Sequence, residues 1–214
     1  MVRKDSAVKA VTDLRGKQLA TNAAGSAVDI AMRAMLKKAK LDDKRDVTII
    51  ETAFPNMKPM LAERKVELIP GVLPFSTDPQ LREMGRTLFT QRDALGVNEL
   101  GFWAARQGFI QKNRAALVDF TEDMMRIVRW YLAPANHKAA VEIAAKITKQ
   151  PAASFDDWLF TDKDYYRDLN MVPNLDALNA NLKLTQELGF LKSAIDIKQY
   201  ADLSIVQEAA KRQR

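Results

Sequence analysis

A small turn near the start of the chain carries the residues best suited to bind an anion. A short apolar run at 18–21 is followed by a polar turn at 22–26 and then by an amphipathic helical pattern. Gly25 lets the backbone come close to a ligand or adopt a positive φ, and Ser26 is a good helix N-cap. The first amides of the next helix point outward with the positive end of its dipole. The spacing therefore predicts an anion site, and an ordinary helix cap without a ligand is the alternative interpretation.

Cysteine and histidine, which many catalytic and metal sites use, are absent or nearly absent from this chain. It contains no cysteine, which excludes disulfides, thiolate catalysis and cysteine metal sites. His137 is its only histidine, and a single histidine argues against a histidine-based metal site or a Ser-His-Asp triad. We therefore expect no cofactor, no metal and no catalytic residues.

Strand and helix patterns alternate through the first part of the chain. In order, the patterns predict a strand at 18–21, a helix from 27 to about 41, a strand at 47–50, a helix at 57–64 and a strand at 66–72. Such alternation implies βαβ crossovers and a parallel sheet with helices on its faces. Ligands of such sheets bind beyond the carboxyl ends of the strands, which here are the segments 22–26, 51–56 and 73–77.

The rest of the chain becomes mainly helical. We expect a short helix at 79–86, candidate strands at 88–90 and 98–105, and later helices at about 113–133, 136–148, 174–188 and 202–210. The first long helix carries an apolar stripe, and its spacing predicts a buried face made of Leu117, Phe120, Met124, Ile127, Val128 and Tyr131.

Composition and charge narrow the classes of partner. Apolar residues make up 47% of the 214-residue chain, which indicates a packed globular protein. The net charge of +6 is dispersed along the sequence. Nucleic-acid binding would be indicated by a basic stripe with interleaved aromatic residues, and the sequence contains no such stripe. No apolar run approaches the roughly 20 residues that a membrane-spanning helix needs. The first residues lack the apolar core of a secretion signal.

The order of these segments resembles that of the solute-binding proteins of ABC importers. The similarity is greatest to the NMT1-like branch, which includes the aliphatic sulfonate, taurine, nitrate and thiamine-pyrimidine binders. The segments that carry the resemblance are DLRGKQLATNAAGS (13–26), VTII (47–50), VELIPGVLPF (66–75), GFWAARQGFIQKNRAALVDF (101–120) and the closing stretch MVPNLDALNANLKLTQELGFLKSAIDIKQYADLSIVQEA (171–209).

The resemblance implies an α/β fold of the periplasmic-binding-protein type II kind, with two βα lobes joined by a hinge. Residues 1–12 would form a leading hinge segment, and 13–97 would form the complete second lobe of the family. Residues 98–214 would supply the return crossing and the helical remainder of the first lobe. Family members normally carry a secretion signal and further βα units at the front. We therefore expect the first lobe to be incomplete and the isolated chain to be poorly stable.

By position, the resemblance also implies the residues that hold the solute. The turn would grasp the anionic group, and two loops would face the cleft between the lobes. The expected ligand-binding residues are Ala24, Gly25, Ser26 and Ala27 in the turn, and Phe54, Pro55, Pro74 and Phe75 in the loops.

The function implied by the resemblance is transport without chemistry. A small anionic organic solute, such as a sulfonate or taurine, would be captured in the periplasm and delivered to the permease subunits of an ABC importer. The alternative is the effector-binding domain of a transcription regulator, which shares the lobe architecture and needs a helix-turn-helix upstream. An enzyme is a third interpretation, but the pyrimidine synthases of the same superfamily depend on cysteine and histidine, which argues against it here.

Overall fold

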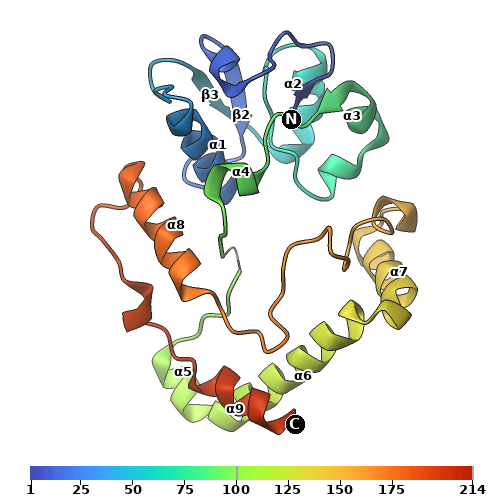
Figure 1. Cartoon of the computed structure of the whole chain (residues 1–214), viewed down its shortest axis with the longest axis vertical. Helices are drawn as coiled ribbons and strands as arrows, with labels where there is room; N and C mark the ends of the chain where they lie inside the picture. Colours follow the sequence, from blue (N-terminus) through green and yellow to red (C-terminus); the bar gives the residue numbers. More distant parts are fainter. Residues whose placement is uncertain (100, 214) are drawn as a thin grey trace. The chain divides into compact units, whose positions relative to one another are not determined.

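The computed structural model describes residues 1–99 and 101–213, and the chain divides into two compact units. Unit 1 comprises Met1–Leu100 and Asp176–Asp196, and unit 2 comprises Gly101–Leu175 and Ile197–Arg214. The chain therefore passes between the units three times, at the boundaries of these segments (Figure 1).

Unit 1 is built on a small parallel sheet. Strand β2 (Gln18–Thr21) pairs in parallel with β3 (Thr48–Glu51), which confirms the parallel pairing predicted for the first two strands. The predicted strand at 66–72 lies beside β2 but forms only an isolated parallel bridge, between Leu68 and Leu19. Pro70 has no N–H to extend the ladder, which explains why the pairing stops there.

Two helices cover the faces of this sheet, α1 (Ala27–Lys38) and α2 (Phe54–Ala62) (Figure 1). Successive residues of a strand point to opposite faces. Accordingly, Leu19 packs in one core cluster with Leu36 of α1. Its neighbour Ala20 packs in another cluster with Leu61 of α2. One helix therefore lies on each face, as the alternation of strands and helices predicts.

Helix α2 begins earlier than its apolar pattern suggests. It starts at Phe54 rather than at 57, and Pro55 occupies its first turn. Proline suits this position because the first amides of a helix have no intrahelical acceptor and the ring already holds the helical φ. The expectation of a loop at 51–56 was therefore wrong for Phe54 and Pro55, which belong to the helix.

The remaining elements of unit 1 surround this core. They are β1 (Val2–Arg3) with its antiparallel partner β4 (Gly85–Arg86), the 3₁₀ turns Val11–Leu14 and Phe75–Thr77, and the helices α3 (Pro79–Met84), α4 (Gln91–Leu95) and α8 (Leu175–Glu187). The strand predicted at 88–90 is absent, because Thr90 and Asp93 form a capping box that starts α4. The described residues of 98–105 form no strand, and residue 100 lies outside the described part.

Unit 2 is helical. Its helices are α5 (Gln107–Lys112), α6 (Arg114–Leu132), α7 (His137–Thr148) and α9 (Ser204–Arg212), with 3₁₀ turns at Pro134–Asn136, Ala152–Ser154 and Ile197–Gln199. The core of the unit lies where α6 packs on α9, through Val118 and Met125 of α6 and Val206 and Ala209 of α9. The long helices were predicted from their apolar spacing, and these predictions are confirmed.

Helix α6 carries two apolar stripes, and the sequence pattern selected the less buried one. Val118 and Met125 are completely buried against α9. Phe120 and Ile127 belong to the predicted core face, yet they are 43% and 49% exposed, whereas Val128 of the same predicted face is buried. Both pairs are spaced seven residues apart, so periodicity alone does not distinguish them. None of the described helices is long and apolar enough to cross a membrane.

Candidate functional site

The predicted anion turn is closed by its own side chains. Ser26 is the N-cap of α1, and its Oγ accepts a hydrogen bond from the Asp29 amide at 3.3 Å and donates to Asn22 Oδ1 at 2.7 Å. The buried Asp29 carboxylate accepts from the Gly25 amide at 2.8 Å. The N-cap role of Ser26 is confirmed. Binding of a solute by the turn stays a prediction.

Some donors of the turn are still available. In the described part of the chain, the backbone amides of Ala24, Ala27 and Val28 have no acceptor from the protein. Ala24 and Ala27 are exposed, and Val28 is partly exposed. An acceptor group placed at the start of α1 would therefore find free N–H groups and the positive end of the helix dipole.

Gly25 accommodates a neighbouring ring. Its φ is +74°, and a Cβ built on it would lie 3.1 Å from the ring of Phe190, which follows α8. The guanidinium of Arg33 lies 5.4 Å from the centre of the same ring. Glycine at this position therefore lets Phe190 pack against the turn, a reason that the local sequence does not reveal.

Gly25→Ala is expected to lower the free energy of unfolding by about 2 kcal/mol, because positive φ is strained for alanine and the new methyl group crowds Phe190. Gly16→Ala is the matched control, since Gly16 has the same φ but nothing lies within 4 Å of the position that an alanine methyl group would take, and it should cost only about 1 kcal/mol. Urea unfolding measures both losses. Equal losses, or a difference that persists in a Phe190→Ala background, would contradict the packing explanation.

The two predicted aromatic residues meet each other. Phe54 and Phe75 stack with ring centroids 5.7 Å apart and an interplanar angle of 24°. Pro74 precedes the 3₁₀ turn Phe75–Thr77, and Pro55 is exposed in the first turn of α2. The structure thus brings Phe54 and Phe75 together, and their contact with a solute stays a prediction.

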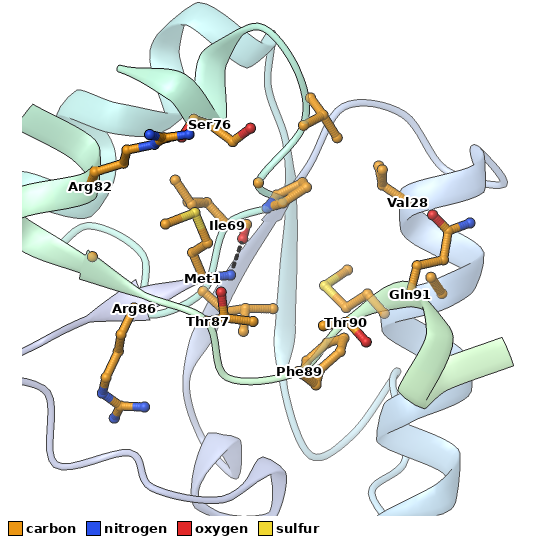
Figure 2. Close-up of a pocket in the computed structure, with 17 residues that line it drawn as sticks. Met1, Val28, Ile69, Ser76, Arg82, Arg86, Thr87, Phe89, Thr90 and Gln91 are labelled. Carbon is orange, nitrogen blue, oxygen red and sulfur yellow. Dashed lines mark hydrogen bonds between the residues drawn. The ribbon is translucent and has the colours of Figure 1, made fainter. Parts of the chain in front are cut away.

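A cavity of about 560 Å³ lies in unit 1 beside the start of α1 (Figure 2). Its walls come from the first turns of α1, from the segment 68–72 that follows the bridge to β2, and from the return segment 85–91. This volume is typical of small-molecule sites. None of the eight predicted ligand residues lines it, but their chain neighbours Val28 and Ser76 do.

The cavity is positively charged. Arg82 and Arg86 line it, and its lining includes no carboxylate. Arg82 Nε donates to the Ser76 carbonyl at 3.3 Å, and Arg86 Nη2 donates to the Val8 carbonyl. Within the described residues neither arginine forms an ion pair. An unopposed guanidinium beside a cavity, as at Arg82, favours an anionic ligand.

A buried amide adds a hydrogen-bond donor to the lining. Gln91 lines the cavity at the start of α4, and its Nε2 is buried without an acceptor in the described structure. The sequence interpretation missed the segment 85–91 because it expected a strand and a loop there. The Thr90 to Asp93 spacing is a capping-box pattern, and it could have located the helix start that positions Gln91.

Asp78 anchors the helix that carries Arg82. It caps α3 by accepting from the Leu81 amide at 2.9 Å, and it pairs with Lys58 at 2.7 Å. The hydrogen bond from Lys58, followed by that from the Leu81 amide, lowers the pKa of Asp78 below its ordinary value of 3.8. The ionised carboxylate therefore stabilises the folded state above pH 3.8, and this contribution disappears as the pH falls through the lowered pKa.

Asp78→Asn is expected to be less stable than the natural protein at neutral pH, because the neutral amide loses the attraction to Lys58. The difference in free energy of unfolding should shrink as the pH falls from 3.8 through the lowered pKa of the folded state, below which Asp78 itself is neutral. Urea unfolding between about pH 2.5 and about pH 7, a range that spans the ordinary carboxyl pKa, measures it. A difference that stays constant with pH would contradict the role of the charge.

A family model identifies the family of the chain, and solved structures identify its fold. The sequence model of the NMT1-like family matches residues 1–145, and no curated protein matches the chain. The chain is similar to the periplasmic aliphatic sulphonate binding protein SsuA from Escherichia coli, with 19% identity, a TM-score of 0.71, and coverage of 96% of this chain and 69% of that one. It is also similar to a putative periplasmic sulfonate-binding protein SsuA from Methylobacillus flagellatus, with 17% identity, a TM-score of 0.73, and coverage of 99% and 64%.

A desulfurization enzyme, DszB, shares the fold as well, with 14% identity, a TM-score of 0.71, and coverage of 100% of this chain and 75% of that one. The predicted α/β fold of the periplasmic-binding-protein kind is therefore confirmed. The chain spans between 64% and 75% of the length of these structures. The assignment of its segments to the two lobes of the family stays a prediction. Among the described residues, no group of three or more histidine, aspartate or glutamate side chains could hold a metal ion.

Proposed function

The chain belongs to the NMT1-like family, and on this basis we propose that it is a solute-binding protein that captures a small anionic organic solute, such as a sulfonate, for an ABC importer. Its partners would be the permease subunits of the importer, and its compartment would be the periplasm. The family match and the shared fold with sulfonate-binding proteins support this proposal.

The observation that carries the choice of ligand is the charge of the cavity. Arg82 presents its guanidinium there, no carboxylate lines the cavity, and most of the other lining residues are apolar. Apolar walls with a few polar groups suit the organic part of a ligand, and the guanidinium of Arg82 suits an anionic head. An alkanesulfonate combines both properties, whereas an inorganic anion would leave the apolar walls without a partner.

The predicted turn fits the same proposal as a second set of donors. Val28 lines the cavity, and the amides of Ala27 and Val28 have no protein acceptor in the described part of the chain. We propose that an oxygen of the solute reaches these amides. The proposed contacts of Ala24, Gly25 and Ser26, and of the stacked rings Phe54 and Phe75, would border this region.

The proposed function requires binding without chemistry. Hydroxyl groups of Ser76, Thr87 and Thr90 line the cavity, but no histidine or carboxylate lines it to act as a general base for them. The likeness to a desulfurization enzyme concerns the fold, and a shared fold does not imply a shared reaction.

Titration calorimetry with butane-1-sulfonate and with the butylammonium ion tests the proposal, because the two ligands share an alkyl chain and differ in the sign of the charge. We expect the sulfonate to bind and the ammonium ion not to bind. A protein that binds neither ligand, or that binds the ammonium ion equally well, would contradict the assignment of this cavity to anionic solutes.

A further inference from the structure

The cavity has polar groups at two opposite ends (Figure 2). Arg82 and Ser76 lie at one end, and Gln91 lies near Val28 at the other. Ile69 and Phe89 are among the apolar residues that line the space between them. A ligand that fills the cavity would therefore meet Arg82 and Ser76 at one end, Gln91 at the other, and between them these apolar side chains together with Thr87 and Thr90.

The two arginines differ in what they can offer to a ligand. Arg86 points away from the cavity in Figure 2 and donates to the Val8 carbonyl. Arg82 uses its Nε for the Ser76 carbonyl, at 3.3 Å, and its two terminal nitrogens have no acceptor among the described residues. A guanidinium with free N–H groups can bind two oxygens of an oxyanion at once. Arg82 is therefore the better candidate to hold the anionic head.

The opposite end of the cavity suits a ligand group that accepts a hydrogen bond and carries no charge. The Nε2 donor of Gln91 is buried and has no acceptor in the described structure, which is an unfavourable state for an amide. The terminal torsion of a glutamine is broad, so the amide can turn toward the cavity at little cost. Besides Gln91, this end offers the backbone amide of Val28 and no arginine or lysine, so its donors call for a hydrogen-bond acceptor rather than for a second fully charged group.

We infer that the solute is an elongated organic anion whose oxyanion binds Arg82 and whose far end carries an uncharged hydrogen-bond acceptor that binds Gln91. This inference rests on the proposed function, because it specifies the solute of the same cavity. Arg82 determines the charge of the ligand, and Gln91 distinguishes an acceptor-bearing tail from a purely hydrocarbon tail of equal length.

A pair of nearly isosteric ligands tests this inference by titration calorimetry. Pentane-1-sulfonate and 3-methoxypropane-1-sulfonate have chains of equal length, but only the second carries an ether oxygen in its tail. The natural protein should bind the ether about 5- to 10-fold more tightly, because a hydrogen bond to Gln91 replaces an unsatisfied donor. Gln91→Met should remove this preference, since methionine keeps the length of the side chain but has no donor.

The outcomes separate this inference from the proposed function. Equal affinities for the two ligands in the natural protein, or an ether preference that survives in Gln91→Met, would overturn the inference and leave sulfonate binding intact. Failure to bind either ligand would overturn both. The comparison in the natural protein decides the question even if the Gln91 variant does not fold, and Arg82→Gln should weaken both ligands by the same factor.

Discussion

Arg82→Gln is expected to weaken the binding of butane-1-sulfonate by about 10- to 100-fold at neutral pH, the range for losing a charge-assisted hydrogen-bond pair. Arg82 lines the cavity, its terminal nitrogens have no acceptor in the described part of the chain, and no carboxylate lines the cavity to neutralise it. Glutamine keeps a hydrogen-bond donor but removes the charge, so the loss reports chiefly the electrostatic contribution. Titration calorimetry measures the dissociation constant of each protein.

Arg92→Gln is the matched control for this experiment. It makes the same change of charge on the exposed surface of α4, at a residue outside the cavity lining. Its affinity for the sulfonate should stay within about twofold of the natural value, because an exposed charge outside the site is screened by salt. Equal losses in the two variants would show that net charge, rather than a contact from Arg82, attracts the ligand.

Asp29→Ala is expected to lower the free energy of unfolding by about 3 kcal/mol, the scale for removing one member of a buried ion pair. Asp29 is fully buried, and its Oδ2 accepts from the Gly25 amide and from Arg33 Nε, both at 2.8 Å. Burial alone would lower the pKa of Arg33, but its hydrogen bonds to Asp29 and Asp43 raise it. The alanine variant leaves Arg33 with only Asp43 and also removes a negative charge from the first turn of α1.

Asp29→Asn serves as the graded control in urea unfolding followed by circular dichroism. Asparagine keeps the shape and one acceptor oxygen but removes the charge, so its loss of stability should lie between those of the natural protein and the alanine variant. A loss below about 0.5 kcal/mol for Asp29→Ala, the range of ordinary surface substitutions, would contradict the structural role of this cluster.

Local patterns were enough to predict the elements that surround the site. The apolar run at 18–21, the cap Ser26 and the spacing of the next helix all act over a few residues, and the structure contains β2, the predicted cap and α1. Patterns failed where two local signals compete. Pro55 allowed α2 to begin inside a stretch that looked like a loop, and α6 carries two apolar stripes with the same spacing.

The candidate site was only partly predictable, because its walls come from distant parts of the chain. The turn at the start of α1 was predicted, and its neighbour Val28 does line the cavity. The places of Arg82 and Gln91 in the lining could not be predicted from spacing alone, since only the tertiary fold brings α3 and the return segment 85–91 to this cavity.

The sequence by itself determined the family, the alternation of strands and helices, and the cap at Ser26, because each depends on the order of segments or on neighbouring residues. Only the tertiary structure decided that Gly25 packs against Phe190 and that Arg82 lines a cavity without a carboxylate. The physical reason is that the position of a glycine and the charge of an arginine can be read from the sequence. The packing of that glycine and the absence of a counter-charge beside that arginine depend on residues that folding brings together.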